Sequence, residues 1–140
     1  MKRAVIASLL VVTSSACESG ARREAQQLAA AVERFRRADN PAKPATVAAI
    51  REVSCTDAEV CGAREACLAA AESTGRALEL KSEVEQGLIA LEKGQLAKES
   101  PEAQALPSKL DMAETLLKEG HARLGACEEQ LAALKRKHRI

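Results

Sequence analysis

Aromatic side chains are almost absent from this chain of 140 residues, which contains one Phe, no Trp and no Tyr. Stacking platforms for bases, sugars and flat cofactors are therefore nearly missing. The core must instead be built from Ala, Leu and Val, and such a core is thin. The sequence also lacks G-x-S-x-G, P-loop, H-E-x-x-H and EF-hand patterns. These absences argue against an enzyme and against a bound cofactor.

Neither sign of charge dominates the sequence. Without residues 1–16, the chain has 19 basic and 20 acidic residues, a net charge of 19 − 20 = −1 with neutral histidines. This balance argues against a nucleic-acid partner. One basic cluster lies near the C-terminus, at Lys135, Arg136, Lys137 and Arg139. It fits two interpretations, which are contact with an anionic surface and cations that oppose a helix macrodipole.

The N-terminus carries the longest apolar run. Two basic residues precede nine mostly apolar residues at 4–12, and four small residues at 13–16 then precede Cys17. Nine residues span about 14 Å as a helix, which is too short to cross a bilayer. A charged start, an apolar run and a small-residue ending predict a secretory signal peptide over residues 1–16.

The segment Ser14-Ser15-Ala16-Cys17 resembles the lipobox of bacterial lipoproteins. The resemblance implies cleavage before Cys17, attachment of three acyl chains there, palmitate among them, and a lipid-anchored protein of the cell envelope. In many Gram-negative lipoproteins, Asp directly after the cysteine causes retention at the inner membrane. This chain has Glu18 at that position, so the resemblance favours the outer membrane. The alternative is an ordinary secretory signal that is cleaved near Cys17 without lipidation.

Cysteine usage is consistent with an oxidising compartment. If a lipid occupies Cys17, four cysteines remain, and an even number suits two disulfides. The C-x5-C-x5-C spacing of the first three fits neither zinc-binding pairs nor a C-x-x-C redox motif. Three pairings are formally open for Cys55, Cys61, Cys67 and Cys127.

Apolar residues recur at helical spacing in the first part of the mature chain. Residues 19–38 are expected to form a helix whose apolar stripe includes Leu28, Val32 and Phe35. A proline-rich break follows, and a short helix is expected over about 44–53. The first helix either packs on the rest of the molecule or forms a stalk near the membrane.

Two long heptad helices are expected in the second half of the chain. Thr56 and Glu59 fit a capping box at the start of a helix that runs to about Lys93. Ser108 fits the start of a last helix that ends near residue 137. In both helices, apolar or small residues recur at alternating intervals of three and four, as in coiled coils, and form a seam along one side of the helix. The expected seams are Val60, Ala63, Cys67, Ala70, Thr74, Ala77, Lys81, Val84, Leu88 and Leu91 in the first, and Leu110, Ala113, Leu117, Gly120, Leu124, Cys127, Leu131 and Leu134 in the second.

Pairing of these seams predicts an antiparallel hairpin, of about residues 57–93 against 108–137. With the N-terminal helix and the short helix, the fold class is an all-α, disulfide-stapled bundle of three to four helices. Residues 17–140 form a single mature domain, in which residues 17–40 are the N-terminal helix or stalk and residues 44–140 are the core.

The hairpin register favours one of the three disulfide pairings. Cys61 and Cys67 are six residues apart on one helix, about 9 Å in rise, which is beyond disulfide reach. If Cys67 lies opposite Cys127, both seams match along their length. Cys55, just before the helix, can then fold back onto Cys61. We therefore expect the pairs Cys67–Cys127 and Cys55–Cys61.

Other chemistry is sparse, and the sequence does not specify a biochemical activity. His121 is expected on a helix surface, and Glu128 and Glu129 are adjacent, so they point to different sides of a helix and form no dyad. The leading hypothesis is a lipid-anchored structural or protein-interaction module of the envelope, whose partner is another envelope protein. The alternatives are a secreted inhibitor or immunity-type protein, and a periplasmic carrier of apolar ligands between helices.

Overall fold

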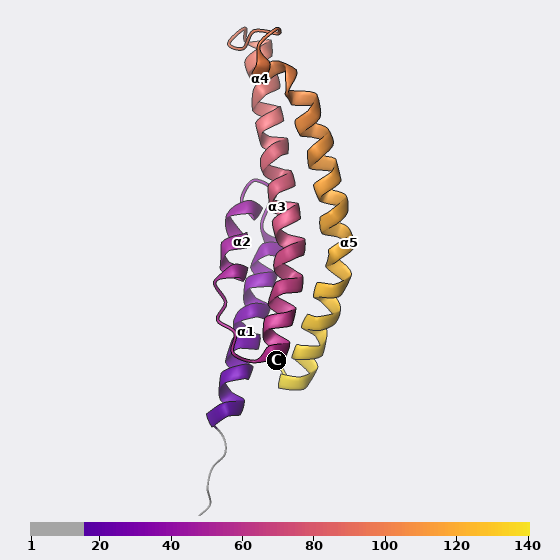
Figure 1. Cartoon of the computed structure of the whole chain (residues 1–140). Helices are drawn as coiled ribbons and strands as arrows, with labels where there is room; N and C mark the ends of the chain where they lie inside the picture. Colours follow the sequence, from indigo (N-terminus) through magenta and orange to yellow (C-terminus); the bar gives the residue numbers. More distant parts are fainter. Residues whose placement is uncertain (1–15) are drawn as a thin grey trace, which may run out of the picture.

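The computed structural model describes residues 16–140, with side chains from Gly20 onward. This part of the chain is all-α (Figure 1), so the predicted fold class is confirmed. The helices are α1 (Ala16–Arg37), α2 (Lys43–Arg51), α3 (Ala58–Glu92), α4 (Pro101–Gln104) and α5 (Leu106–His138).

Helices α3 and α5 form the predicted antiparallel hairpin, with α4 in the connection between them (Figure 1). The 35 residues of α3 give a helix about 52 Å long. The register places Cys67 opposite Cys127, with their Cα atoms 4.5 Å apart. Lys109 and Glu83 form an ion pair of 2.7 Å further along. The same register therefore holds beyond the disulfide.

Helices α1 and α2 lie against the half of the hairpin that is remote from α4 (Figure 1). Leu28 and Val32 of α1 and Ile50 of α2 are almost fully buried in the main core, together with the Cys67–Cys127 pair. Burial of these large side chains against α3 and α5 stabilises the packing of α1 and α2 on the hairpin. The described part of α1 thus packs on the hairpin along its predicted stripe.

Beyond α1 and α2 the predicted seam is only partly buried: Val84 and Ala113 are buried, whereas three larger seam residues are exposed. Leu88, Leu110 and Leu117 are 50%, 42% and 40% exposed, although the heptad pattern places them in the seam. The small core of this half consists of Ala77, Leu80 and Ala113.

The predicted capping residue of α3 is wrong. Asp57, not Thr56, is the N-cap, and its carboxylate accepts hydrogen bonds from the amides of Glu59 (2.9 Å) and Val60 (3.1 Å). Thr56 does not cap this helix, because its amide and its hydroxyl both donate to Glu24 of α1. The acceptor for the Thr56 amide is therefore Glu24, 32 residues away, and not Glu59 as the capping box predicts.

The last helix begins before its predicted start at Ser108. Its first residue is Leu106, and Pro107 lies in the first turn, where a helix needs no amide donor. The Ser108 hydroxyl donates to the carbonyl of Ala105 at 2.9 Å instead of capping the helix. In the connection before it, Ser100 caps the four-residue helix α4.

Candidate functional site

The half of the hairpin that α1 and α2 leave uncovered is the first candidate site. We name residues 78–117 the arm, and residues 20–77 and 118–140 the base. The arm extends beyond α1 and α2 toward α4 (Figure 1). Within the described residues, every large apolar side chain that is exposed lies on the arm. These side chains are Leu88, Ile89, Leu110, Met112 and Leu117. Exposed apolar groups gathered on one part of a molecule indicate an interaction surface.

The arm and the base carry opposite net charge. The arm has eight acidic residues and four basic residues, all lysines, which gives a net charge of −4. The base has fifteen basic and eleven acidic residues, which gives +4. Surface charge of one sign steers partners of the opposite sign. The exposed leucines of the arm therefore lie in acidic surroundings.

An apolar pocket lies between α1, α3 and α5, where the base meets the arm. It has a volume of about 430 Å³, and its lining includes Phe35, Thr74, Leu117 and Leu124. At its rim, the Lys43 ammonium donates to the carbonyls of Phe35 (2.9 Å) and Arg36 (3.1 Å). The same ammonium lies 5.0 Å from the centroid of the Phe35 ring. The pocket can therefore accept an apolar group beside a cation that is already hydrogen-bonded.

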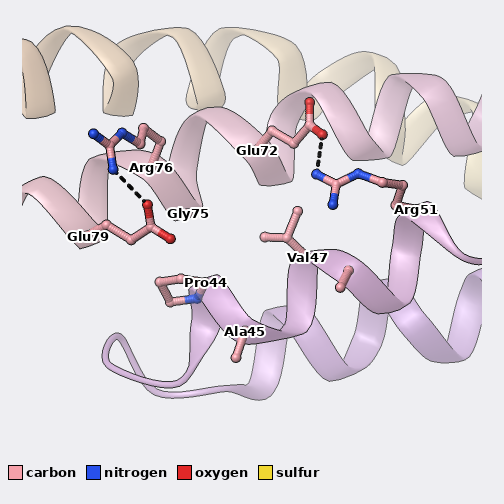
Figure 2. Close-up of a pocket in the computed structure, with 9 residues that line it drawn as sticks. Pro44, Ala45, Val47, Arg51, Glu72, Gly75, Arg76 and Glu79 are labelled. Atoms are coloured by element: carbon pink, nitrogen blue, oxygen red, sulfur yellow. Dashed lines mark hydrogen bonds and ion pairs between the residues drawn. The ribbon is translucent and has the colours of Figure 1, made fainter.

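A second pocket, of about 370 Å³, lies between α2 and α3 and is more polar (Figure 2). Figure 2 shows Arg51 paired with Glu72 and Arg76 paired with Glu79, at 2.7 and 3.0 Å. Each charge at this site is matched by an opposite one, so the pocket favours neither an anionic nor a cationic ligand. These exposed pairs contribute little to stability, and we assign the pocket no function.

Glu24 connects α1 to the turn before α3. Its carboxylate accepts hydrogen bonds from the amide and the hydroxyl of Thr56, both at 2.9 Å. The Thr56 amide is the main reason that the pKa of Glu24 lies below its ordinary value. Glu24 was not among the residues predicted from the sequence, although its position four residues before Leu28 places it on the apolar stripe. An acidic residue on such a stripe is the signal that could have identified it.

The four remaining cysteines form two disulfides. Cys55 is bonded to Cys61 and Cys67 to Cys127, which is the pairing that the hairpin register predicts. The Cα atoms of the first pair are 5.2 Å apart. Cys67 and Cys127 are buried in the main core, whereas Cys61 lies at the start of α3. All four sulfur atoms are consumed structurally, so none of these cysteines is a free nucleophile.

The predicted lipidation site, Cys17, has a side chain that lies outside the described residues, as does the predicted signal peptide except for the backbone of Ala16. Figure 1 places the first turns of α1 and the C-terminus at the same end of the molecule, opposite α4. No helix among residues 16–140 has the length and apolar character needed to span a membrane.

The predicted basic cluster lies in the last turn of α5 and at Arg139, the residue that follows it. Lys135, Arg136 and Arg139 are exposed, and Lys137 forms a 2.8 Å ion pair with Glu59 of α3. The hydrogen bond to Glu59 raises the pKa of Lys137 above its ordinary value. Lys137 therefore links the C-terminal end of α5 to the N-terminal end of α3. All the cations of the cluster are placed to oppose the macrodipole of α5.

The histidines and carboxylates do not assemble into a reactive centre. His121 is exposed at the edge of the apolar pocket, and His138 is half-buried, with no hydrogen-bond partner on its buried Nε2. Glu128 pairs with Arg36 at 3.3 Å, and Glu129 is exposed. Among the described residues, no group of three or more ligating side chains is placed to hold a metal ion.

Comparison with known proteins gives no match. No protein-family model, no curated protein and no solved structure matches this chain. The candidate sites are therefore interpreted from their own geometry, charge and exposure.

Proposed function

We propose that this chain is a bacterial lipoprotein of the cell envelope and acts as a protein-interaction module, not as an enzyme. Residues 1–16 serve as the signal peptide, and Cys17 carries the lipid that holds the mature protein in the membrane, the outer membrane being favoured. The proposal needs no cofactor. Its anchoring part is supported by the charged, apolar and small segments before Cys17.

The interaction part rests on one observation, the exposed apolar surface of the arm. Its five large apolar side chains are 40–55% exposed and lie in acidic surroundings. Such a surface is unfavourable for a protein that works alone, because it exposes apolar area to water. α1 begins at the end opposite the arm (Figure 1), so an anchor at Cys17 directs the arm away from the membrane.

Mass spectrometry of the native protein tests the anchor. The expected N-terminal peptide begins at Cys17 and carries the mass of three acyl chains. Globomycin, which inhibits the lipoprotein signal peptidase, should cause the precursor to accumulate, and Cys17→Ser should give a soluble or unprocessed product. An unmodified N-terminus on the native protein would contradict the anchoring part of the proposal.

Photo-crosslinking in cells tests the interaction part. A photoreactive residue in place of Leu110 or Leu88 on the arm should give one adduct of defined mass. The same residue in place of Gln26, which is exposed on α1 of the base, is the control and should give none. Equal adducts at arm and base positions would show random collision and would remove the interaction role.

A carrier of apolar ligands is the second candidate, and the pocket between α1, α3 and α5 favours it. Native mass spectrometry of the purified protein should then show a small molecule bound in equimolar amount. Leu124→Lys places a charge in the pocket lining and should abolish the bound species. A protein that carries no ligand and takes up no fluorescent apolar probe removes this candidate.

A further inference from the structure

We propose that the arm binds a basic amphipathic helix of another protein, which lies end to end with α1 and continues the bundle that α1 begins. The binding surface is an apolar track formed by Leu88, Leu110 and Leu117. This inference rests on the proposed interaction role and specifies the surface and the chemistry of the partner.

α1 shows what kind of helix fits this face of the hairpin. Residues 20–37 contain five arginines and two glutamates, so the helix is basic. It buries Leu28 and Val32 against α3 and α5, and its Arg36 pairs with Glu128 of α5 at 3.3 Å. A basic helix with an apolar stripe thus already occupies the lower part of the face.

Beyond the end of α1, toward α4, no other helix of residues 16–140 packs on this face of the hairpin (Figure 1). Thr74 of α3 and Leu117 of α5 line the apolar pocket at the end of α1, beside Phe35. Steps of seven residues keep a side chain on nearly the same side of a helix, so Leu110 follows Leu117 on α5. On α3 the first such step from Thr74 reaches Lys81, whose ammonium lies 4.0 Å from the carboxylate of Glu85, and the second step reaches Leu88. The uncovered face is therefore a direct extension of the one that α1 occupies.

The length of the uncovered face sets the size of the partner helix. From Thr74 to Glu92, α3 advances eighteen residues, or about 27 Å. A partner helix of about 18 residues spans this distance. Contact with a third helix would bury the leucines that the two-helix arm leaves at its side.

Charge decides between a basic partner and a second copy of this chain. Glu92 lies four residues after Leu88, and Glu114 lies four residues after Leu110, so acidic side chains flank the track. Within residues 20–140, neither of these glutamates has an ion-pair partner. Two arms with a net charge of −4 each repel one another when they are placed face to face. A basic helix meets no such repulsion on the acidic arm.

Peptide binding tests the proposal directly. The probe is a synthetic peptide of about 18 residues made of Leu and Lys, with Leu at helical spacing. It is titrated into residues 17–140 carrying Cys17→Ser, so that no lipid competes for it. The controls are a scrambled peptide of the same composition and a peptide with Glu in place of every Lys. We expect saturable, equimolar binding of the basic amphipathic peptide alone.

Two variants of α5 locate the binding surface. Leu110→Glu and Met112→Glu each add one negative charge at an exposed position, where the native side chains are 42% and 55% exposed. The two positions lie about 200° apart around the helix. Attraction of charges alone would strengthen binding in both variants. Docking on the track instead predicts that Leu110→Glu weakens binding about tenfold or more, whereas Met112→Glu changes it less than about twofold. Equal effects in the two variants overturn the proposal.

Two further results would separate a basic helix from a second copy of this chain, and the interaction role from the assignment of its partner. If sedimentation shows a dimer that Leu110→Glu dissociates, and the peptide does not bind, the track accepts a second copy and the proposal is wrong. If the peptide does not bind but photo-crosslinking at position 110 still captures a partner, the interaction role stands and the basic-helix assignment fails. Loss of both signals removes both proposals.

Discussion

Glu24 makes the stability of the base depend on pH. Because the amides and the hydroxyl around it stabilise the charged carboxylate, its pKa is lower in the folded protein than in the unfolded chain. A lowered pKa gives a stabilising contribution that is present above the unfolded value and is lost as the pH falls through the folded value. The contribution therefore disappears below the ordinary glutamate range, about pH 4.3.

Replacement of Glu24 by Gln isolates this contribution. The Gln amide keeps one acceptor for the Thr56 amide but has no charge to lose. At about pH 7 we expect Glu24→Gln to be less stable than the native protein, and the difference should shrink toward about pH 3. Urea unfolding at several pH values, followed by circular dichroism, measures it. A difference that stays constant with pH would show that the charge of Glu24 does not contribute.

Gly120 of α5 packs tightly against α3. A Cβ atom on Gly120 would lie 2.5 Å from the Thr74 hydroxyl oxygen and 3.2 Å from the carbonyl oxygen of Ala70. Alanine at this position would force the helices apart, so we expect Gly120→Ala to destabilise the protein by about 1–3 kcal/mol. Unfolding in urea measures the loss.

Gly125 of the same helix is the matched control for that substitution. A Cβ atom there meets nothing within 4 Å, so Gly125→Ala gains helix propensity without a clash. We expect it to be stabilising by about 1 kcal/mol or less. If both glycine variants gain stability, the close approach of α3 and α5 at Gly120 is not what the structure indicates.

The two disulfides close loops of very different length. Cys67–Cys127 joins the two long helices and closes a loop of 60 residues, whereas Cys55–Cys61 closes a loop of 6 residues. A longer loop removes more conformational freedom from the unfolded chain, so the first bond should contribute about 4 kcal/mol and the second about 2 kcal/mol.

Paired substitutions test this difference without leaving a free thiol. Removing Cys67 and Cys127 together should lower the free energy of unfolding more than removing Cys55 and Cys61 together. The larger effect includes lost packing, because the first pair is buried in the main core. Thermal and urea unfolding of the two double variants to alanine provide the comparison. Similar losses in both would mean that loop length does not control the contribution.

Stability should differ between the two ends of the molecule. The base buries the main core of α1, α2, α3 and α5, whereas the arm has only the small core around Leu80 and Ala113. Regions with few buried contacts open more often than the rest of a protein. We expect amides in residues 84–92 and 106–112 to exchange with deuterium roughly tenfold or more faster than those in residues 63–71. Hydrogen-exchange mass spectrometry checks this expectation, and uniform protection along α3 would contradict it.

Binding of a partner helix should change this pattern in a defined way. A third helix on the track covers Leu88 and Leu110, so exchange should slow in the arm and remain unchanged in the base. The same mass-spectrometric experiment, with and without the basic amphipathic peptide, measures the change. Slower exchange throughout the protein would indicate binding elsewhere.

Periodicity and cysteine positions were sufficient to predict the hairpin. Steps of three and four residues mark an amphipathic helix irrespective of its surroundings, and only one register matches both seams while it brings Cys67 to Cys127. Charge, short apolar runs and turn residues likewise determine where the helices break. These features are local, or depend on one pairing, so the sequence alone contains them.

Packing between segments far apart in the sequence determines which side chains are exposed and which hydrogen bonds they form. Thr56 has the local pattern of a helix cap, but Glu24, 32 residues away, accepts its hydrogen bonds instead. Leu110 and Leu117 have the pattern of buried seam residues, but they are exposed because α1 and α2 end before the arm and no third helix covers it. A heptad pattern records which side of a helix is apolar. Whether that side meets protein or water depends on how far the neighbouring helices extend, which is a property of the folded molecule.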